Sequence, residues 1–188
     1  MSNWIAKRTR RKRNAHNLYG SIVTLARARV LYAGMGAPDT VESRFELLVF
    51  HLFACLGSLK RSSGEKKYVA QYLVDKFFAD MDTTSRELGV GDTAVPKRMR
   101  QIAAVFEERM TLYKEAAENK NKNALVAALA ENVFGSSYDA AMMQDLTSYV
   151  RELQQSLSRT PITDLEAGRI CVLDEAMFEN DSINESVT

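Results

Sequence analysis

Residues 41–59, which read VESRFELLVFHLFACLGSL, decide the fold of this chain of 188 residues. Their apolar side chains recur at helical spacing and cover most of the circumference of a helix. A helix that is apolar on nearly every side is usually enclosed by other helices. We therefore expect this segment to be the central helix of a bundle, with Asp39 or Thr40 as its N-cap.

Helical periodicity extends over most of the remaining chain. Three prolines and nine glycines provide few turns, and no segment alternates convincingly as a strand over more than four residues. The sequence therefore predicts an all-α fold, a single-domain bundle of about six helices. The five further helices are expected over residues 14–33, 69–88, 93–117, 125–133 and 146–157.

Charge is distributed unevenly along the chain, although the net charge is only +1. Residues 1–13 contain six basic residues and no acidic one, whereas residues 174–188 contain five acidic residues and no basic one. A general nucleic-acid-binding protein would be basic over a whole face, so any contact with an anionic partner should be local. We expect a basic flexible arm over 1–13, a helical domain over 14–158 and a loosely ordered acidic tail over 159–188.

Composition also indicates the compartment. Two cysteines are too few for a disulfide framework and fit a reducing environment. The longest apolar stretch, residues 47–57, is about half of the roughly 20 residues that a membrane-spanning helix needs. No hydrophobic segment follows the N-terminal charges, as a secretory signal would require. We expect a cytoplasmic protein, with peripheral membrane contact as a further possibility.

The basic arm has three interpretations. It is a solvated segment without a specific partner, it binds an anionic membrane surface, or it binds RNA phosphates such as those of a ribosome. On an anionic bilayer each cation contributes about 1 kcal/mol, so six contribute at most roughly 6 kcal/mol and the contact is reversible. Both kinds of anionic contact weaken with salt, so salt dependence does not separate them. The residues expected to bind an anionic surface are Lys7, Arg8, Arg10, Arg11, Lys12 and Arg13.

A metal site or a nucleophile is the first enzymatic hypothesis. His51 and Cys55 lie four residues apart and so share a helix face, but zinc needs three or four ligands. The remaining histidine and cysteine, His16 and Cys171, are distant in sequence. The structural alternative is a buried polar seam in which His51 is hydrogen-bonded and Cys55 is a small apolar filler. We favour this alternative and expect no catalytic residues, metal or cofactor.

A glycine-containing connection is the second candidate. Gly89 and Gly91 precede a helix start, where anions can bind. No strand precedes them and no third glycine follows, so the dinucleotide-binding pattern is not met. A tight link between two helices, with glycine in a left-handed conformation, is the favoured interpretation.

Charges around this connection carry more information. Asp80, Asp82 and Glu87 are placed near the end of one helix, and basic residues follow at the start of the next. Each set lies at the unfavourable end of its helix dipole, at a cost of roughly 0.3–1 kcal/mol per charge. Salt bridges between the two sets would relieve this cost, and an external partner would do the same. The basic set is Lys97, Arg98 and Arg100.

Three distinctive stretches surround the charged connection: FFADMD from residue 77, RELGVGD from residue 86 and VPKRM from residue 95. Supporting stretches are LYG from residue 18 and PDTVESRFE from residue 38 before the connection, and AENVFG from residue 130 and YVR from residue 149 after it. Together these stretches resemble the ubiquinol–cytochrome c chaperone family, and the resemblance covers about residues 14–157.

This resemblance implies a helical, non-enzymatic chaperone for assembly of the cytochrome bc1 complex (respiratory complex III). Its client would be newly made cytochrome b or another complex III subunit, and its location the cytoplasm, peripheral to the inner membrane. A homodimer is also considered, because an apolar groove without its client tends to self-associate. The rival interpretation is a nucleic-acid- or ribosome-binding regulator that acts through the basic arm.

Two groups of residues are expected to contact the client. Exposed aromatic and methionine side chains would form adaptable contacts in a groove, with packing into the core as the alternative. The residues of this first group are Tyr32, Met35, Met142 and Met143. The charged connection is the favoured docking site for a client or partner. Its residues are Asp80, Asp82, Arg86, Glu87, Gly89, Gly91, Asp92, Lys97 and Arg98.

Overall fold

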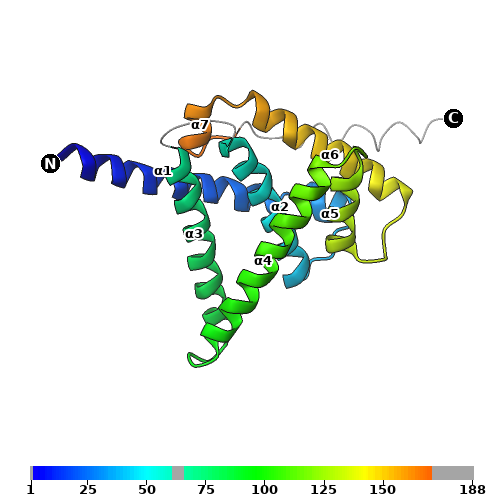
Figure 1. The fold of residues 1–188 in the computed structure, drawn as a ribbon. Coiled ribbons are helices and arrows are strands. Elements are labelled where there is room, and N and C mark those ends of the chain that lie inside the picture. Colours follow the sequence, from blue (N-terminus) through cyan, green and yellow to red (C-terminus); the bar gives the residue numbers. More distant parts are fainter. Residues whose placement is uncertain (1, 61–65, 171–188) are drawn as a thin grey trace.

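A computed structural model describes residues 2–60 and 66–170 of the chain, and these form helices and loops without a strand (Figure 1). The all-α prediction is thus confirmed. A π-helical turn, Val30–Gly34, follows the first helix. The α-helices are α1 (Ser2–Ala26), α2 (Val41–Lys60), α3 (Lys66–Glu87), α4 (Val95–Glu118), α5 (Ala124–Phe134), α6 (Ala140–Arg159) and α7 (Ile162–Glu166).

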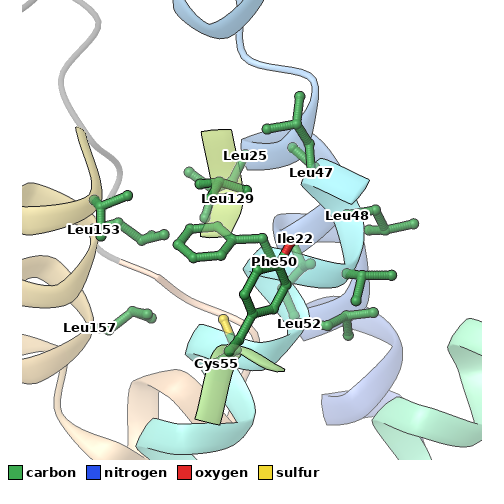
Figure 2. Packing of buried hydrophobic residues seen from close by; sticks show 14 of the residues in the cluster. Ile22, Leu25, Leu47, Leu48, Phe50, Leu52, Cys55, Leu129, Leu153 and Leu157 are labelled. Carbon is green, nitrogen blue, oxygen red and sulfur yellow. The ribbon is translucent and has the colours of Figure 1, made fainter. Parts of the chain in front are cut away.

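Helix α2 is the central element, as its all-round apolar sequence predicts. It contacts α1, α3, α4, α5 and α6. Figure 2 shows leucines of neighbouring helices gathered around Phe50 of α2, whose side chain is 1% exposed. The predicted N-cap is Thr40, because its Oγ1 accepts a hydrogen bond of 3.2 Å from the backbone N–H of Ser43. Asp39 instead pairs with the Arg44 guanidinium.

Helices α3 and α4 form a V whose tip extends away from the rest of the molecule (Figure 1). Aromatic rings hold the two arms together. The rings of Phe77 and Phe106 stack with their centroids 5.0 Å apart, and Phe78 contacts Phe106 edge-on at 5.4 Å. Phe45 of α2 joins this cluster through Phe77. Burial of such large rings fixes the V against the central helix and so positions the charged connection at its tip.

The N-terminal segment differs from its expected form. Residues 2–13 are the first turns of α1 rather than a separate flexible arm, so the expected boundary at residue 14 is wrong. Interactions with α3 explain the difference. The Arg11 guanidinium lies 4.3 Å from the ring centroid of Tyr68, and the Lys12 ammonium lies 5.8 Å from that of Tyr72. These cation–π contacts fasten a strongly basic helix to its neighbour.

A loosely ordered tail was expected over residues 159–188. Up to residue 170, however, the chain after α6 folds back and packs against the core. Leu165 of α7 and Ile170 are buried against the core. Gly168 has φ +80°, and a Cβ there would lie 2.4–2.6 Å from atoms of Asn17 and Leu18. Its carbonyl accepts a hydrogen bond of 2.6 Å from Ser21 Oγ, so only glycine fits this contact with α1. The acidic segment 174–188 and Cys171 lie outside the described residues.

Candidate partner-docking surfaces

The charged connection between α3 and α4 is built on a glycine turn. Gly89 has φ +83°, the left-handed conformation that commonly ends a helix. Its N–H donates to the carbonyl of Arg86 at 3.0 Å, and the next N–H, of Val90, donates to that of Ser85 at 3.1 Å. Pro96 occupies the first turn of α4, where a missing N–H costs little. These features confirm the interpretation as a tight helix–helix link.

The carboxylates of Asp80, Asp82 and Asp92 are paired within the protein, whereas Glu87 is exposed and has no ion pair among the described residues. Tyr19 of α1 donates a hydrogen bond of 2.8 Å to Asp80, and Lys76 lies 3.9 Å from the same carboxylate. Arg86 pairs with Asp82 at 2.8 Å and with Asp92 at 2.5 Å. The expected site residues Asp80, Asp82, Arg86 and Asp92 therefore support the shape of the connection.

The basic side has no ion-pair partner in the part of the chain that the structure describes. Lys97, Arg98 and Arg100 are exposed at the N-terminus of α4. Within residues 2–60 and 66–170, no carboxylate lies within ion-pair distance of these three side chains. The salt bridges expected between the two sets are thus not formed among the described residues, because Tyr19 and Lys76 contact Asp80 and Arg86 pairs with Asp82. Three cations stay at the positive end of the α4 dipole, where they favour a bound anion.

The connection also carries an exposed apolar side chain. Leu88 is 64% exposed at the end of α3, and the neighbouring Glu87, Gly89 and Gly91 are exposed as well. We call Leu88, Lys97, Arg98 and Arg100 the tip patch. It presents one exposed apolar side chain and three positive charges, and the exposed acidic Glu87 precedes Leu88 in the sequence.

The hypothetical His51 and Cys55 site is a buried structural seam. His51 Nδ1 donates to the Leu47 carbonyl at 2.7 Å, which leaves Nε2 to accept from the Tyr149 hydroxyl at 2.6 Å. Burial lowers the pKa of His51 to about 4, so its imidazole is neutral at pH 7. Burial raises the pKa of the Cys55 thiol to about 12, which opposes formation of a thiolate. The structural interpretation of both residues is confirmed.

One buried ion pair was missed by the sequence reasoning. Glu46 of α2 is 7% exposed, and both its carboxylate oxygens accept from Arg109 Nε of α4, at 2.9 and 3.0 Å. Burial raises the pKa of Glu46 although Arg109 opposes this shift. The signal was an acidic residue inside an otherwise apolar stretch. Its partner could not be predicted from spacing, because Arg109 lies 63 residues away.

The proposed aromatic and methionine contacts pack within the core or against it. Met35 is only 3% exposed. Tyr32, Met142 and Met143 are half-buried and pack against the same hydrophobic cluster. In Tyr32 the hydroxyl also donates to the Ala26 carbonyl at 3.0 Å. Packing is therefore the role that the structure gives to this group, and the charged surfaces are the stronger docking candidates.

The basic residues of α1 form the second candidate surface. Lys7, Arg8, Arg10, Lys12 and Arg13 are exposed, whereas Arg11 is half-buried against α3. None of the described helices is long and apolar enough to cross a bilayer. In the same part of the chain, no cluster of three or more histidine, cysteine, aspartate or glutamate side chains is arranged to bind a metal ion.

Together these features define the class of the protein: a helical protein with a leucine-rich core that exposes charged surfaces at the tip of α3 and α4 and along the basic helix α1. The chain belongs to the ubiquinol–cytochrome c chaperone family, because the family model matches residues 33–173. This confirms the resemblance of the motifs around the charged connection.

A solved structure and curated relatives agree with this assignment. The chain is similar to the crystal structure of the Cbp3 homologue from Brucella abortus, with 32% identity, a TM-score of 0.78, and coverage of 92% of this chain and 96% of that one. It is 26% identical over 129 residues to ubiquinol–cytochrome-c reductase complex assembly factor 1 of Xenopus laevis, covering 68% of this chain and 64% of that protein. The mouse and human proteins of the same name are each 26% identical over 152 residues, or 80% of this chain. The chain spans about half the length of these two.

Proposed function

We propose that this protein is a non-enzymatic chaperone that assists the assembly of ubiquinol–cytochrome c reductase by transiently holding one of its subunits. The observation that carries this proposal is the match to the family over residues 33–173, together with the likeness to a solved structure over 92% of the chain at a TM-score of 0.78. Newly made cytochrome b is the proposed client. None of the relatives named above is described as a nucleic-acid-binding protein, so the rival interpretation gains no support.

The tip patch is the proposed docking site for the client or for a partner subunit. Its three cations lie at the positive end of α4 without an internal counter-ion among the residues that the structure describes. Each such charge costs roughly 0.3–1 kcal/mol, and a bound acidic segment would remove this cost. Leu88 would add apolar burial beside the charges. In this proposal Asp80, Asp82, Arg86 and Asp92 act indirectly, since they fix the connection that presents the patch.

Charge reversal at the tip patch tests this assignment. In cells that lack the native gene, the double variant Lys97→Glu, Arg98→Glu is expected to restore several-fold less ubiquinol–cytochrome c reductase activity than the unchanged protein. The reason is that two attractive charges become repulsive towards an acidic partner. Reductase activity per milligram of membrane protein is the measurement.

A matched control separates docking from a general effect of charge. Lys120 and Lys122 are exposed in the loop between α4 and α5, so Lys120→Glu, Lys122→Glu makes the same charge change elsewhere. It should leave reductase activity unchanged. Equal activity of the tip and control variants, at equal protein levels, would contradict docking at the tip while leaving the chaperone proposal to be tested by gene deletion.

A further inference from the structure

The basic helix α1 exposes large apolar side chains at its N-terminal end. The helix extends past α3, so its first turns project from the body (Figure 1). Trp4 is 65% exposed and Ile5 is 59% exposed, although large apolar side chains are usually buried. The sequence of α1 contains no aspartate or glutamate. Its surface therefore combines uncovered apolar side chains with positive charge only.

A shallow cleft gathers several of these charges. Ile5, Arg8, Lys12 and His16 follow one another at steps of three, four and four residues, so they lie along one stripe of α1. The last three line a cleft of about 450 Å³ together with Tyr72, Asp75 and Lys76 of α3. Of these, Asp75 accepts a hydrogen bond of 2.9 Å from Gln71, and the Lys12 ammonium lies over the Tyr72 ring. Arg8, Lys12 and Lys76 bring three cations to the cleft against the one carboxylate of Asp75, and Lys76 also lies 3.9 Å from Asp80. A phosphate group would therefore be held mainly by Arg8 and Lys12.

We propose that this face of α1 binds the surface of an anionic phospholipid bilayer. Phosphate headgroups would occupy the cleft between Arg8, Lys12 and Lys76, and Trp4 and Ile5 would enter the boundary between headgroups and acyl chains. Basic amphipathic helices with an apolar end bind membranes in this manner, and tryptophan is enriched at that boundary. Each cation near an anionic surface strengthens binding about fivefold, so the contact is reversible.

The same cations would also attract RNA, but the aromatic rings favour a membrane. Proteins that bind single-stranded RNA stack bases on exposed aromatic faces. Here the cations of the helix lie over these rings: Arg8 over Trp4 at 5.6 Å, Arg11 over Tyr68 at 4.3 Å, and Lys12 over Tyr72. Ile5 provides no stacking face at all. A lipid bilayer would contact both the cations of α1 and its exposed apolar side chains, whereas RNA would contact the cations alone.

Trp4 is the only tryptophan in the chain, so its fluorescence reports directly on this face. The full-length protein is titrated with vesicles of phosphatidylcholine alone and with vesicles that contain phosphatidylcholine and phosphatidylglycerol in equal amounts. A blue shift of the Trp4 emission is expected with the anionic vesicles only. The absence of a shift with these vesicles, or the same shift with inorganic phosphate or an RNA oligonucleotide in place of vesicles, would overturn the proposal.

Co-sedimentation with the same anionic vesicles assigns the residues. The variant Arg8→Gln, Lys12→Gln is expected to bind about 30-fold more weakly, which corresponds to about 2 kcal/mol. Trp4→Ala should also bind more weakly because it removes the apolar anchor. The control Lys120→Gln, Lys122→Gln loses the same charge from an exposed loop and should bind as the unchanged protein does. Equal binding of the Arg8, Lys12 variant and this control would overturn the assignment to α1.

Discussion

Replacement of Arg109 by methionine is expected to lower the free energy of unfolding by about 2–4 kcal/mol, because it leaves the Glu46 carboxylate buried without its counter-ion. Methionine retains much of the apolar part of the arginine side chain, so the lost charge, rather than lost packing, accounts for most of the change in the free energy of unfolding. The pKa of Glu46 is already raised by burial and should rise further. Urea unfolding at pH 7, followed by circular dichroism at 222 nm, measures the effect.

Two further variants isolate the cause of this loss. Glu46→Gln combined with Arg109→Met removes both charges and should recover much of the stability, since no unpaired ion is then buried. Arg44→Met removes the exposed pair with Asp39, in which the two side chains are 51% and 62% exposed, and should change stability little. A loss for Arg109→Met no larger than that for Arg44→Met would contradict the structural importance of the buried pair.

Stability is expected to decrease by up to about 3 kcal/mol as the pH falls from about 6.5 to about 4, because of His51. Burial lowers the pKa of folded His51 to about 4, whereas the unfolded residue titrates near 6.5. Between these values only the unfolded chain binds the proton, so acid favours unfolding. The contribution is complete above pH 6.5 and is lost as the pH falls towards 4. Urea unfolding at several pH values measures it.

The variant His51→Asn provides the comparison for this pH dependence. Glu46 acts in the opposite direction, because its raised pKa means that the folded state binds its proton more readily in acid. The His51→Asn variant retains the pH-dependent contribution of Glu46 and lacks that of His51. Its unfolding free energy should therefore vary less between pH 6.5 and 4 than that of the unchanged protein. Identical pH dependence of the two proteins would show that buried, neutral His51 is not its source.

The sequence predicted the elements that depend on local pattern. The all-round apolar segment of α2, the cap at Thr40 and the glycine end of α3 are each specified within a few residues, and all three are as expected. The interpretation of His51 also succeeded, because a lone histidine in a strongly apolar helix must be hydrogen-bonded locally or to a neighbouring helix. Its partner Tyr149, 98 residues away, was not predictable from spacing.

The expectations that failed depend on distant partners. Residues 1–13 were expected to form a flexible basic arm, but Arg11 and Lys12 contact Tyr68 and Tyr72 of α3, which the local sequence does not reveal. Asp80 was expected to contact an external partner, but its carboxylate accepts a hydrogen bond from Tyr19 of α1, which is 61 residues away in the sequence. Helical spacing predicts which residues share a face. It does not predict which other helix covers that face.

Gene deletion tests the central claim most directly. In the organism that carries this chain, loss of the protein is expected to reduce ubiquinol–cytochrome c reductase activity in the membranes to a small fraction of its normal value. The activity of another respiratory enzyme, succinate dehydrogenase, should be unchanged, and reintroducing the gene should restore the reductase. Normal amounts of active reductase in membranes without the protein would contradict the proposal that this helical chaperone serves complex III assembly.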